Sequence, residues 1–276
     1  MAASDRFRTL PSELLLELFV AANLGFLTLD IYLAHSTNSF RERAEYIPLY
    51  FSACAPIVLL FGLRYRESRI WRIAGYAVAL MSIAVGLAGV VFHLDSSFFY
   101  EKTLKSLTYS APFAAPLAYA GLGFLLLLNR MVESSSAEWA AWVMFFALGG
   151  FAGNFVLSLG DHATNGFYYS TEWVPVAMSA VAVGFLFTAV FLSPGRRFLQ
   201  LCGGVMVFAA AVGIWGFALH AKANLVGPSI HAFANFVHGA PPFAPLLFPN
   251  LAILGLLGIY SGLAQANQLA NKKRIW

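Results

Sequence analysis

The sequence is poor in charged residues and in cysteine, and each shortage excludes a class of protein. Charged residues make up 11% of the 276 residues, whereas soluble domains carry about 25%, so the chain cannot cover the surface of a soluble fold. The 2 cysteines, Cys54 and Cys202, lie in apolar runs and are too few to staple an extracellular domain. The net charge of +4 does not indicate a nucleic-acid partner, because the basic residues flank apolar segments instead of forming one patch.

Motifs of well-known enzyme classes are also missing. The sequence contains no glycine-rich nucleotide loop, no H-E-x-x-H zinc motif and no G-x-S-x-G nucleophile elbow. Acyl transfer and nucleotide chemistry are therefore not indicated, and whether the chain is an enzyme stays open.

Long apolar runs dominate what is present. Hydrophobic residues make up 59% of the chain, and a helix needs about 20 of them in succession to cross a bilayer. Because the runs are continuous and do not alternate, they predict helices and not a barrel. We expect an all-α integral membrane protein in contact with the lipid bilayer. Its eight transmembrane helices are expected at about 14–34, 47–64, 73–93, 111–128, 138–160, 174–193, 200–220 and 243–264.

The distribution of Lys and Arg predicts the orientation. Twelve of the 17 basic residues fall on the side that holds both termini, and five fall on the other side. Because cytoplasmic loops carry the excess of Lys and Arg, both termini are expected in the cytoplasm, with the chain in a bacterial inner membrane. All six histidines then lie toward the outer surface.

The sequence repeats itself at a constant spacing of 127 residues. Residues 35–48 read HSTNSFRERAEYIP and residues 162–175 read HATNGFYYSTEWVP, with six of fourteen positions identical. Residues 84–93 (AVGLAGVVFH) and 211–220 (AVGIWGFALH) share five of ten positions at the same spacing. A weaker echo at a spacing of 130 links residues 111–114 to 241–244. These matches indicate a tandem duplication of a four-helix unit.

The duplication predicts two halves, residues 1–130 and residues 131–276. Each half would hold four membrane-spanning helices, which is an even number, so both halves would have the same orientation. We therefore expect them to be related by a pseudo-twofold axis along the membrane normal.

Polar residues that the repeat retains predict a site at the outer surface. His35 ends the first expected span, Glu45 opens the second and His93 ends the third, so all three lie at similar depth. Two histidines and a carboxylate suit iron, copper or zinc with an open coordination position, which favours a redox-linked role. The metal ligands are thus expected to be His35, Glu45, His93, His162, Glu172 and His220, arranged as two sites or as one composite site between the halves.

Three further residues are expected to support the ligands. Asn38 and Asn165 are placed to hydrogen-bond a ligand imidazole, which is the usual role of a residue behind a metal ligand. Asp30 lies inside the first expected span, where an acid is a functional candidate, and its counterpart in the repeat is Leu157.

Two alternatives to a non-haem metal centre stay open. In the first, the pairs His35 with His93 and His162 with His220 supply the axial ligands of haem b, and glycines such as Gly86 and Gly89 on the histidine face of the helix leave room for the macrocycle. In the second, the repeated residues serve only the fold, and the chain is an accessory subunit bound to other subunits of a larger membrane complex.

Overall fold

The computed structural model describes residues 11–109, 111–192 and 194–273, and in these ranges all regular secondary structure is helical. Among these described residues, seven helices are long and apolar enough to cross a membrane, which supports the expected helical membrane protein. They are α1 (Ser12–Ser36), α2 (Tyr46–Arg64), α3 (Arg69–Asp95), α7 (Ala137–Thr164), α8 (Trp173–Phe191), α9 (Arg196–Val226) and α11 (Leu247–Lys273). Three of the basic residues behind the expected orientation, Arg6, Arg8 and Arg274, lie outside the described residues.

An eighth apolar helix, α6, is shorter than a usual membrane span. It covers Leu117–Met131, which is 15 residues or about 22 Å at 1.5 Å per residue, against about 30 Å of hydrocarbon. The expected span of 111–128 was placed too early, because Pro112 and Pro116 disfavour a helix in the preceding turn.

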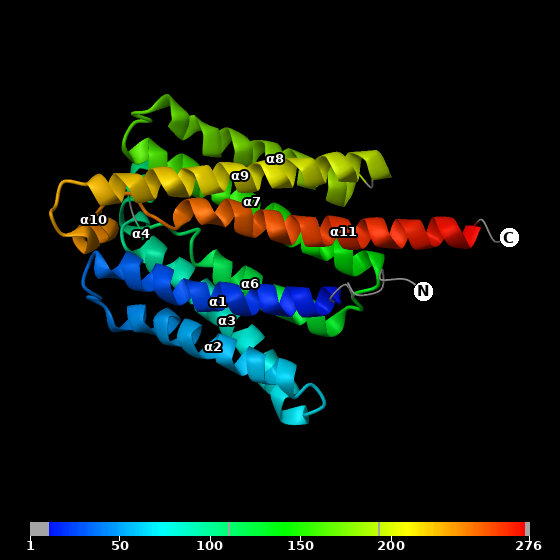
Figure 1. Ribbon diagram of the computed structural model, residues 1–276. Helices are drawn as coiled ribbons and strands as arrows, with labels where there is room; N and C mark the ends of the chain where they lie inside the picture. The colour runs from blue at the N-terminus through cyan, green and yellow to red at the C-terminus, as the bar shows by residue number, and fades with distance from the viewer. Residues whose placement is uncertain (1–10, 110, 193, 274–276) are drawn as a thin grey trace.

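Short helices connect the long ones at one end of the molecule. They are η1 (Arg43–Glu45), α4 (Phe98–Glu101), α5 (Leu104–Tyr109), η2 (Ser170–Glu172), α10 (Ala232–His238) and η3 (Ala244–Leu246). Figure 1 places α4 and α10 at the end of the molecule opposite the beginning of α1 and the end of α11.

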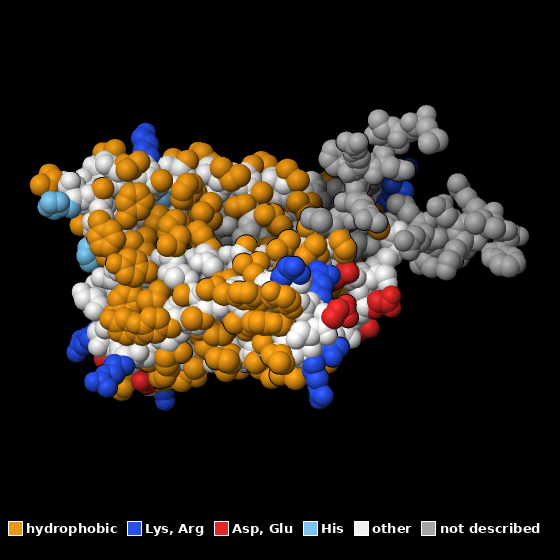
Figure 2. Space-filling view, turned by 60° about the horizontal axis from the view of Figure 1, so that its bottom comes forward, with side chains coloured by type: hydrophobic (Ala, Val, Ile, Leu, Met, Phe, Trp, Pro, Cys, Tyr) orange, Lys and Arg blue, Asp and Glu red, His pale blue; other side chains and the backbone are white. Residues whose placement is uncertain are grey.

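The long helices pack as two groups. The first helix group contains α1, α2, α3 and α6, and the second contains α7, α8, α9 and α11; α1 with α11 and α6 with α7 make the contacts between them (Figure 1). Side chains such as Leu24, Trp139 and Phe151 are fully buried. Figure 2 shows apolar side chains over the middle of the visible face and Lys and Arg toward its two ends, as lipid contact requires.

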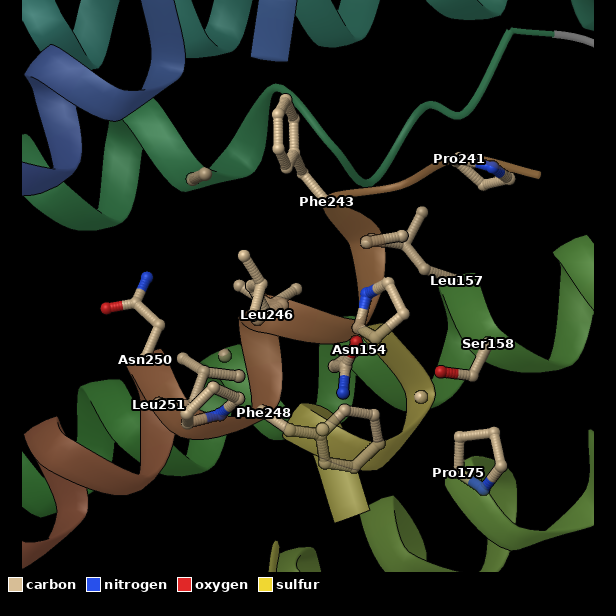
Figure 3. Close-up of a pocket in the computed structure, with 18 of the residues that line it drawn as sticks. Asn154, Leu157, Ser158, Pro175, Pro241, Phe243, Leu246, Phe248, Asn250 and Leu251 are labelled. Atoms are coloured by element: carbon tan, nitrogen blue, oxygen red, sulfur yellow. The ribbon is translucent and has the colours of Figure 1, made fainter. Parts of the chain in front are cut away.

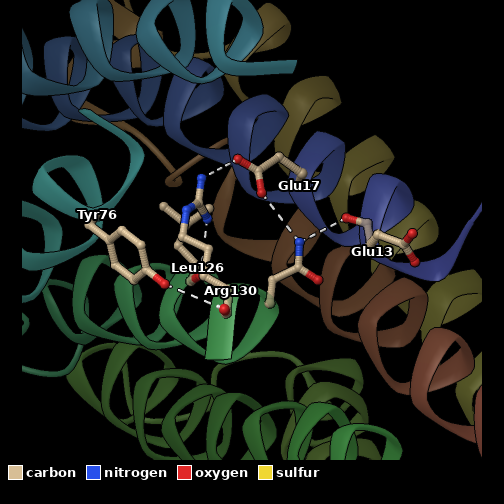
Figure 4. A network of polar contacts seen from close by, with 6 residues as sticks. Glu13, Glu17, Tyr76, Leu126 and Arg130 are labelled. Atoms are coloured by element: carbon tan, nitrogen blue, oxygen red, sulfur yellow. Dashed lines mark hydrogen bonds and ion pairs between the residues drawn. The ribbon is translucent and has the colours of Figure 1, made fainter. Parts of the chain in front are cut away.

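A buried ion pair joins α1 to α6 inside the first helix group (Figure 4). The Arg130 guanidinium donates to Glu17 Oε1 at 2.5 Å, and the two side chains are only 15% and 10% exposed. Asn129 Nδ2 donates to the Glu13 carbonyl at 2.8 Å and to Glu17 Oε2 at 3.3 Å. From the sequence Arg130 was expected to be a charge in a cytoplasmic loop; in the structure it neutralises an acid within the α1 span.

Candidate functional site

The first candidate group forms where α1 turns into α2. His35 lies in the last turn of α1, and its Nδ1 lies 3.6 Å from Oε2 of Glu45, with side chains 22% and 13% exposed. Asn38 Nδ2 donates to Glu45 Oε1 at 2.7 Å, and Asn38 Oδ1 accepts from the backbone N–H of Phe40 at 3.1 Å. In the structure Asn38 therefore bonds the carboxylate that faces the imidazole, and not the imidazole itself.

His93 joins this group from the last turn of α3. Its ring centre lies 6.3 Å from that of His35, with the ring planes at 72°. His93 Nδ1 lies 3.0 Å from the carbonyl oxygen of Pro112, and since a carbonyl only accepts, Nδ1 is the donor. We call His35 and His93 the first histidine pair.

The same contacts recur 127 residues later. His162 Nδ1 lies 3.8 Å from Glu172 Oε2, and Asn165 Nδ2 donates to Glu172 Oε1 at 3.2 Å, so Asn165 holds the carboxylate as Asn38 does. His220 Nδ1 donates to the carbonyl of Pro241 at 2.8 Å, and the rings of His162 and His220 are 6.4 Å apart at 85°. We call these two residues the second histidine pair.

A second proline follows each carbonyl that binds a histidine. Pro116 lies four residues after Pro112, and Pro245 lies four residues after Pro241. Proline has no N–H, so the hydrogen bond that a helix would direct from residue i+4 to this carbonyl cannot form. The sequence reasoning missed both carbonyls, although the echo between residues 111–114 and 241–244 marked the segments that contain them.

A phenylalanine in a left-handed backbone conformation lies two residues after each asparagine. Phe40 has φ 52° and Phe167 has φ 53°, a conformation that costs a residue with a side chain about 1 kcal/mol. Phe40 stacks on Tyr46 at 4.8 Å and Phe167 stacks on Trp173 at 3.9 Å. Strained backbone conformations of this kind are frequent at functional sites. Here the stacking contacts stabilise the strained conformation of each phenylalanine beside the histidines.

One oxygen of each glutamate lacks a hydrogen bond. Within the described ranges, Oε2 of Glu45 and Oε2 of Glu172 are buried and have no hydrogen-bond partner. Each faces the Nδ1 atom of a histidine, at 3.6 Å and 3.8 Å. Burying a carboxylate oxygen without a hydrogen bond costs free energy. A positively charged partner at these two oxygens would lower that cost.

The expected three-residue metal sites are not assembled in the structure. Among the described residues, no three His, Cys, Asp or Glu side chains are grouped closely enough to hold a metal ion. In the same part of the chain, no hydrogen bond reaches Nε2 of the four paired histidines. The described residues also include no ring contact between the two pairs, so nothing there supports one composite site.

The glycines near the histidines leave no room for a macrocycle. A Cβ atom on Gly86 would lie 2.6 Å from the backbone nitrogen of Ala120, and one on Gly89 would lie 2.7 Å from Pro116. Gly213 and Gly216 are covered in the same way, by Phe248 and Pro245. These glycines allow α3 and α9 to pack closely on neighbouring segments. The prediction that they leave space for a haem at this face is therefore wrong.

A large cavity lies between the two helix groups, beside the second histidine pair. This central cavity has a volume of about 2190 Å³ and is lined by residues of α1, α6, α7, α9 and α11; Figure 3 shows part of its wall, from α7 and from residues 241–251. His162, Glu172 and His220 line it, as does Asp30. Among the described residues no hydrogen bond or ion pair joins Asp30 to His35, so Asp30 belongs to the cavity wall.

Comparison with known proteins identifies no relative of this chain. No family model, no curated protein and no solved structure matches it. Its function is therefore inferred from its own residues.

Proposed function

We propose that the chain binds iron, copper or zinc near one membrane surface, through Nε2 of His35 and His93 and Nε2 of His162 and His220, in a redox-linked role. The observation that carries this proposal is the environment of the Nδ1 atoms. In each pair, one Nδ1 faces a carboxylate and the other donates to a carbonyl. Histidines that bind metals have an acceptor of this kind behind the ring, which fixes the tautomer and directs Nε2 to the ion.

The distance between the rings determines how an ion would fit. With metal–nitrogen bonds of about 2 Å, a tetrahedral ion needs ring centres about 5 Å apart. The observed separations are 6.3 Å and 6.4 Å, so binding would draw each pair about 1 Å closer. Glu45 and Glu172 act in this proposal as acceptors behind His35 and His162, and become ligands only if they move past those rings. Open coordination positions remain for water, oxygen or a substrate.

Haem b is the second candidate, and the same distance favours it. Two axial imidazoles on opposite sides of one iron place their ring centres about 6 Å apart, close to the observed 6.3 Å and 6.4 Å. Because the glycines of α3 and α9 are covered, the macrocycle would have to enter from another side.

We also propose that α6 is a fourth span of the first half and that the chain consists of two related halves. The recurrence of the histidine contacts at a spacing of 127 residues supports this, as do the equal lengths of α2 and α8, 19 residues each. With eight spans, both termini lie on one side of the membrane. The excess of basic residues on that side supports the proposal that it is the cytoplasmic side, in a bacterial inner membrane.

The test is to measure metal and haem in the purified protein and in a double variant. Ultraviolet–visible spectra, oxidised and dithionite-reduced, are combined with elemental analysis of the same sample. A Soret band that shifts on reduction supports haem, and stoichiometric iron, copper or zinc without that band supports the non-haem site. His93→Ala with His220→Ala should abolish the bound group, whereas His231→Ala with His238→Ala should not. No bound group, or an unchanged content in the folded His93/His220 variant, would overturn the proposal.

A further inference from the structure

We propose that the central cavity binds a zwitterionic aminophospholipid, with its head at the histidine end and its acyl chains along the glycines of α7. This inference goes beyond metal binding and does not depend on it. Three independent features of the cavity support it: its size and apolar walls, an open stretch of its wall, and charges of both signs at one end.

The size and the apolar walls of the cavity favour a lipid as its ligand. Its volume of about 2190 Å³ exceeds the roughly 300–1,000 Å³ of pockets for small molecules. Large apolar side chains of α1 face it, including Leu15, Leu18 and Phe26, which are 36%, 37% and 38% exposed. Apolar cavities do not hold water, and in a bilayer the abundant apolar groups able to fill such a space are acyl chains.

Glycines keep one wall of the cavity open. Gly149 and Gly153 of α7 and Gly121 of α6 line the cavity, and a Cβ atom on any of them would meet nothing within 4 Å. A G-x-x-x-G pattern such as Gly149 to Gly153 usually marks a close contact between two helices. Here no described side chain or helix lies within 4 Å of a Cβ atom on these glycines, which leaves a recess along the cavity into which an acyl chain fits.

Charges of both signs lie at the outer end of the cavity. Asp30 of α1, Asp161 of α7 and Lys222 of α9 line it, and within the described part of the chain no hydrogen bond or ion pair reaches their charged groups. Glu172 lines the same end, so a head with a phosphate and an ammonium group matches one lysine and three carboxylates, whereas an anionic head would meet three like charges. This complementarity favours an aminophospholipid over phosphatidylglycerol.

Photolabelling of the full chain tests the chain-binding part of the proposal. The protein is reconstituted in vesicles that contain phosphatidylethanolamine with a diazirine on its acyl chain. Gly149→Leu with Gly153→Leu fills the recess and should reduce labelling about tenfold, which corresponds to a loss of about 1.4 kcal/mol of binding free energy. Gly184→Leu in α8 is the matched control, because its Cβ also meets nothing within 4 Å and Gly184 does not line the cavity.

Three outcomes would overturn the proposal. Equal labelling of the double variant and the Gly184→Leu control is one, and an unmodified protein with no labelled peptide among those of α1, α6, α7, α9 and α11 that line the cavity is another. The second outcome decides the matter even if the double variant fails to fold. The third concerns the head. Asp30→Asn with Asp161→Asn removes two of the carboxylates that repel an anionic head, so it should lower the ratio of phosphatidylethanolamine to phosphatidylglycerol that co-purifies, measured by mass spectrometry. An unmodified protein that retains both lipids equally would contradict the assignment of the head.

Discussion

At the residue scale, Glu45 and Glu172 connect the two kinds of side chain that the repeat retains. Each glutamate accepts from an asparagine through Oε1 and faces a histidine through Oε2. The asparagine holds the carboxylate in one rotamer, and the carboxylate in turn can orient the imidazole. A substitution of the glutamate should therefore change the orientation of the histidine ring, although the backbone stays in place.

Glu45→Gln tests this chain of contacts at the first histidine pair. The amide keeps the shape of the side chain, but it removes the charge and can present an N–H to His35 Nδ1, so the ring loses its acceptor. Metal affinity at the first pair should fall about 10- to 100-fold, measured by competition with a chelator of known affinity. Glu172→Gln should have the same effect at the second pair only, and an unchanged affinity in both variants would show that the carboxylates do not orient the rings.

Some contacts of the candidate site could be predicted from the sequence, and others could not. The helix ends and the repeat were enough to bring His35, Glu45 and His93 to one edge. The partner of Asn38 was not predictable, because the left-handed conformation of Phe40 sets the direction of that loop. The carbonyl of Pro112 lies 19 residues after His93, across a connection whose path no periodic pattern indicates.

At the scale of single elements, the ion pair between α1 and α6 is the feature that sequence reasoning missed. Glu17 and Arg130 are 113 residues apart, and neither has a charged counterpart in the repeat. The helices themselves were predictable, because their apolar runs are long. The start of α6 was not, because the effect of Pro112 and Pro116 on the first turn outweighs the apolar composition of residues 111–116.

Removing one member of this pair should destabilise the first helix group. Glu17→Gln leaves the Arg130 guanidinium largely buried beside a neutral amide, which costs about 3 kcal/mol, and the midpoint of thermal unfolding in detergent should fall. Glu17→Gln combined with Arg130→Met removes both charges and should restore part of the loss. If the single variant unfolds at the temperature of the unmodified protein, the pair contributes nothing to stability.

At the scale of the whole molecule, the class of fold was predictable from composition and run length alone. Few charges and long apolar runs leave a helical membrane protein as the solution, and seven helices in the described part of the chain are long and apolar enough to span a bilayer. The number of crossings depends on α6, whose 15 residues fall below the usual length. A short helix can still cross where the bilayer thins around it.

Cysteine labelling from the two sides of the membrane decides the topology. In a background of Cys54→Ala and Cys202→Ala, a membrane-impermeant maleimide added to intact cells should label Ser39→Cys and Ser229→Cys. Glu67→Cys and Ser135→Cys should react only after permeabilisation. Labelling of Ser135→Cys in intact cells would show that α6 does not cross, and the two halves would then have opposite orientations.

The paired prolines before α6 and before α11 have a consequence for how this protein tolerates change over evolutionary time. A residue with an N–H at position 116 or 245 would add a donor that competes with His93 or His220 for the carbonyl of Pro112 or Pro241. Lipid-facing positions carry no such constraint, so distant relatives would keep little overall similarity. They would instead share a spacing: a histidine, an asparagine three residues on, a glutamate seven residues further, and two prolines four residues apart before the last helix of each half.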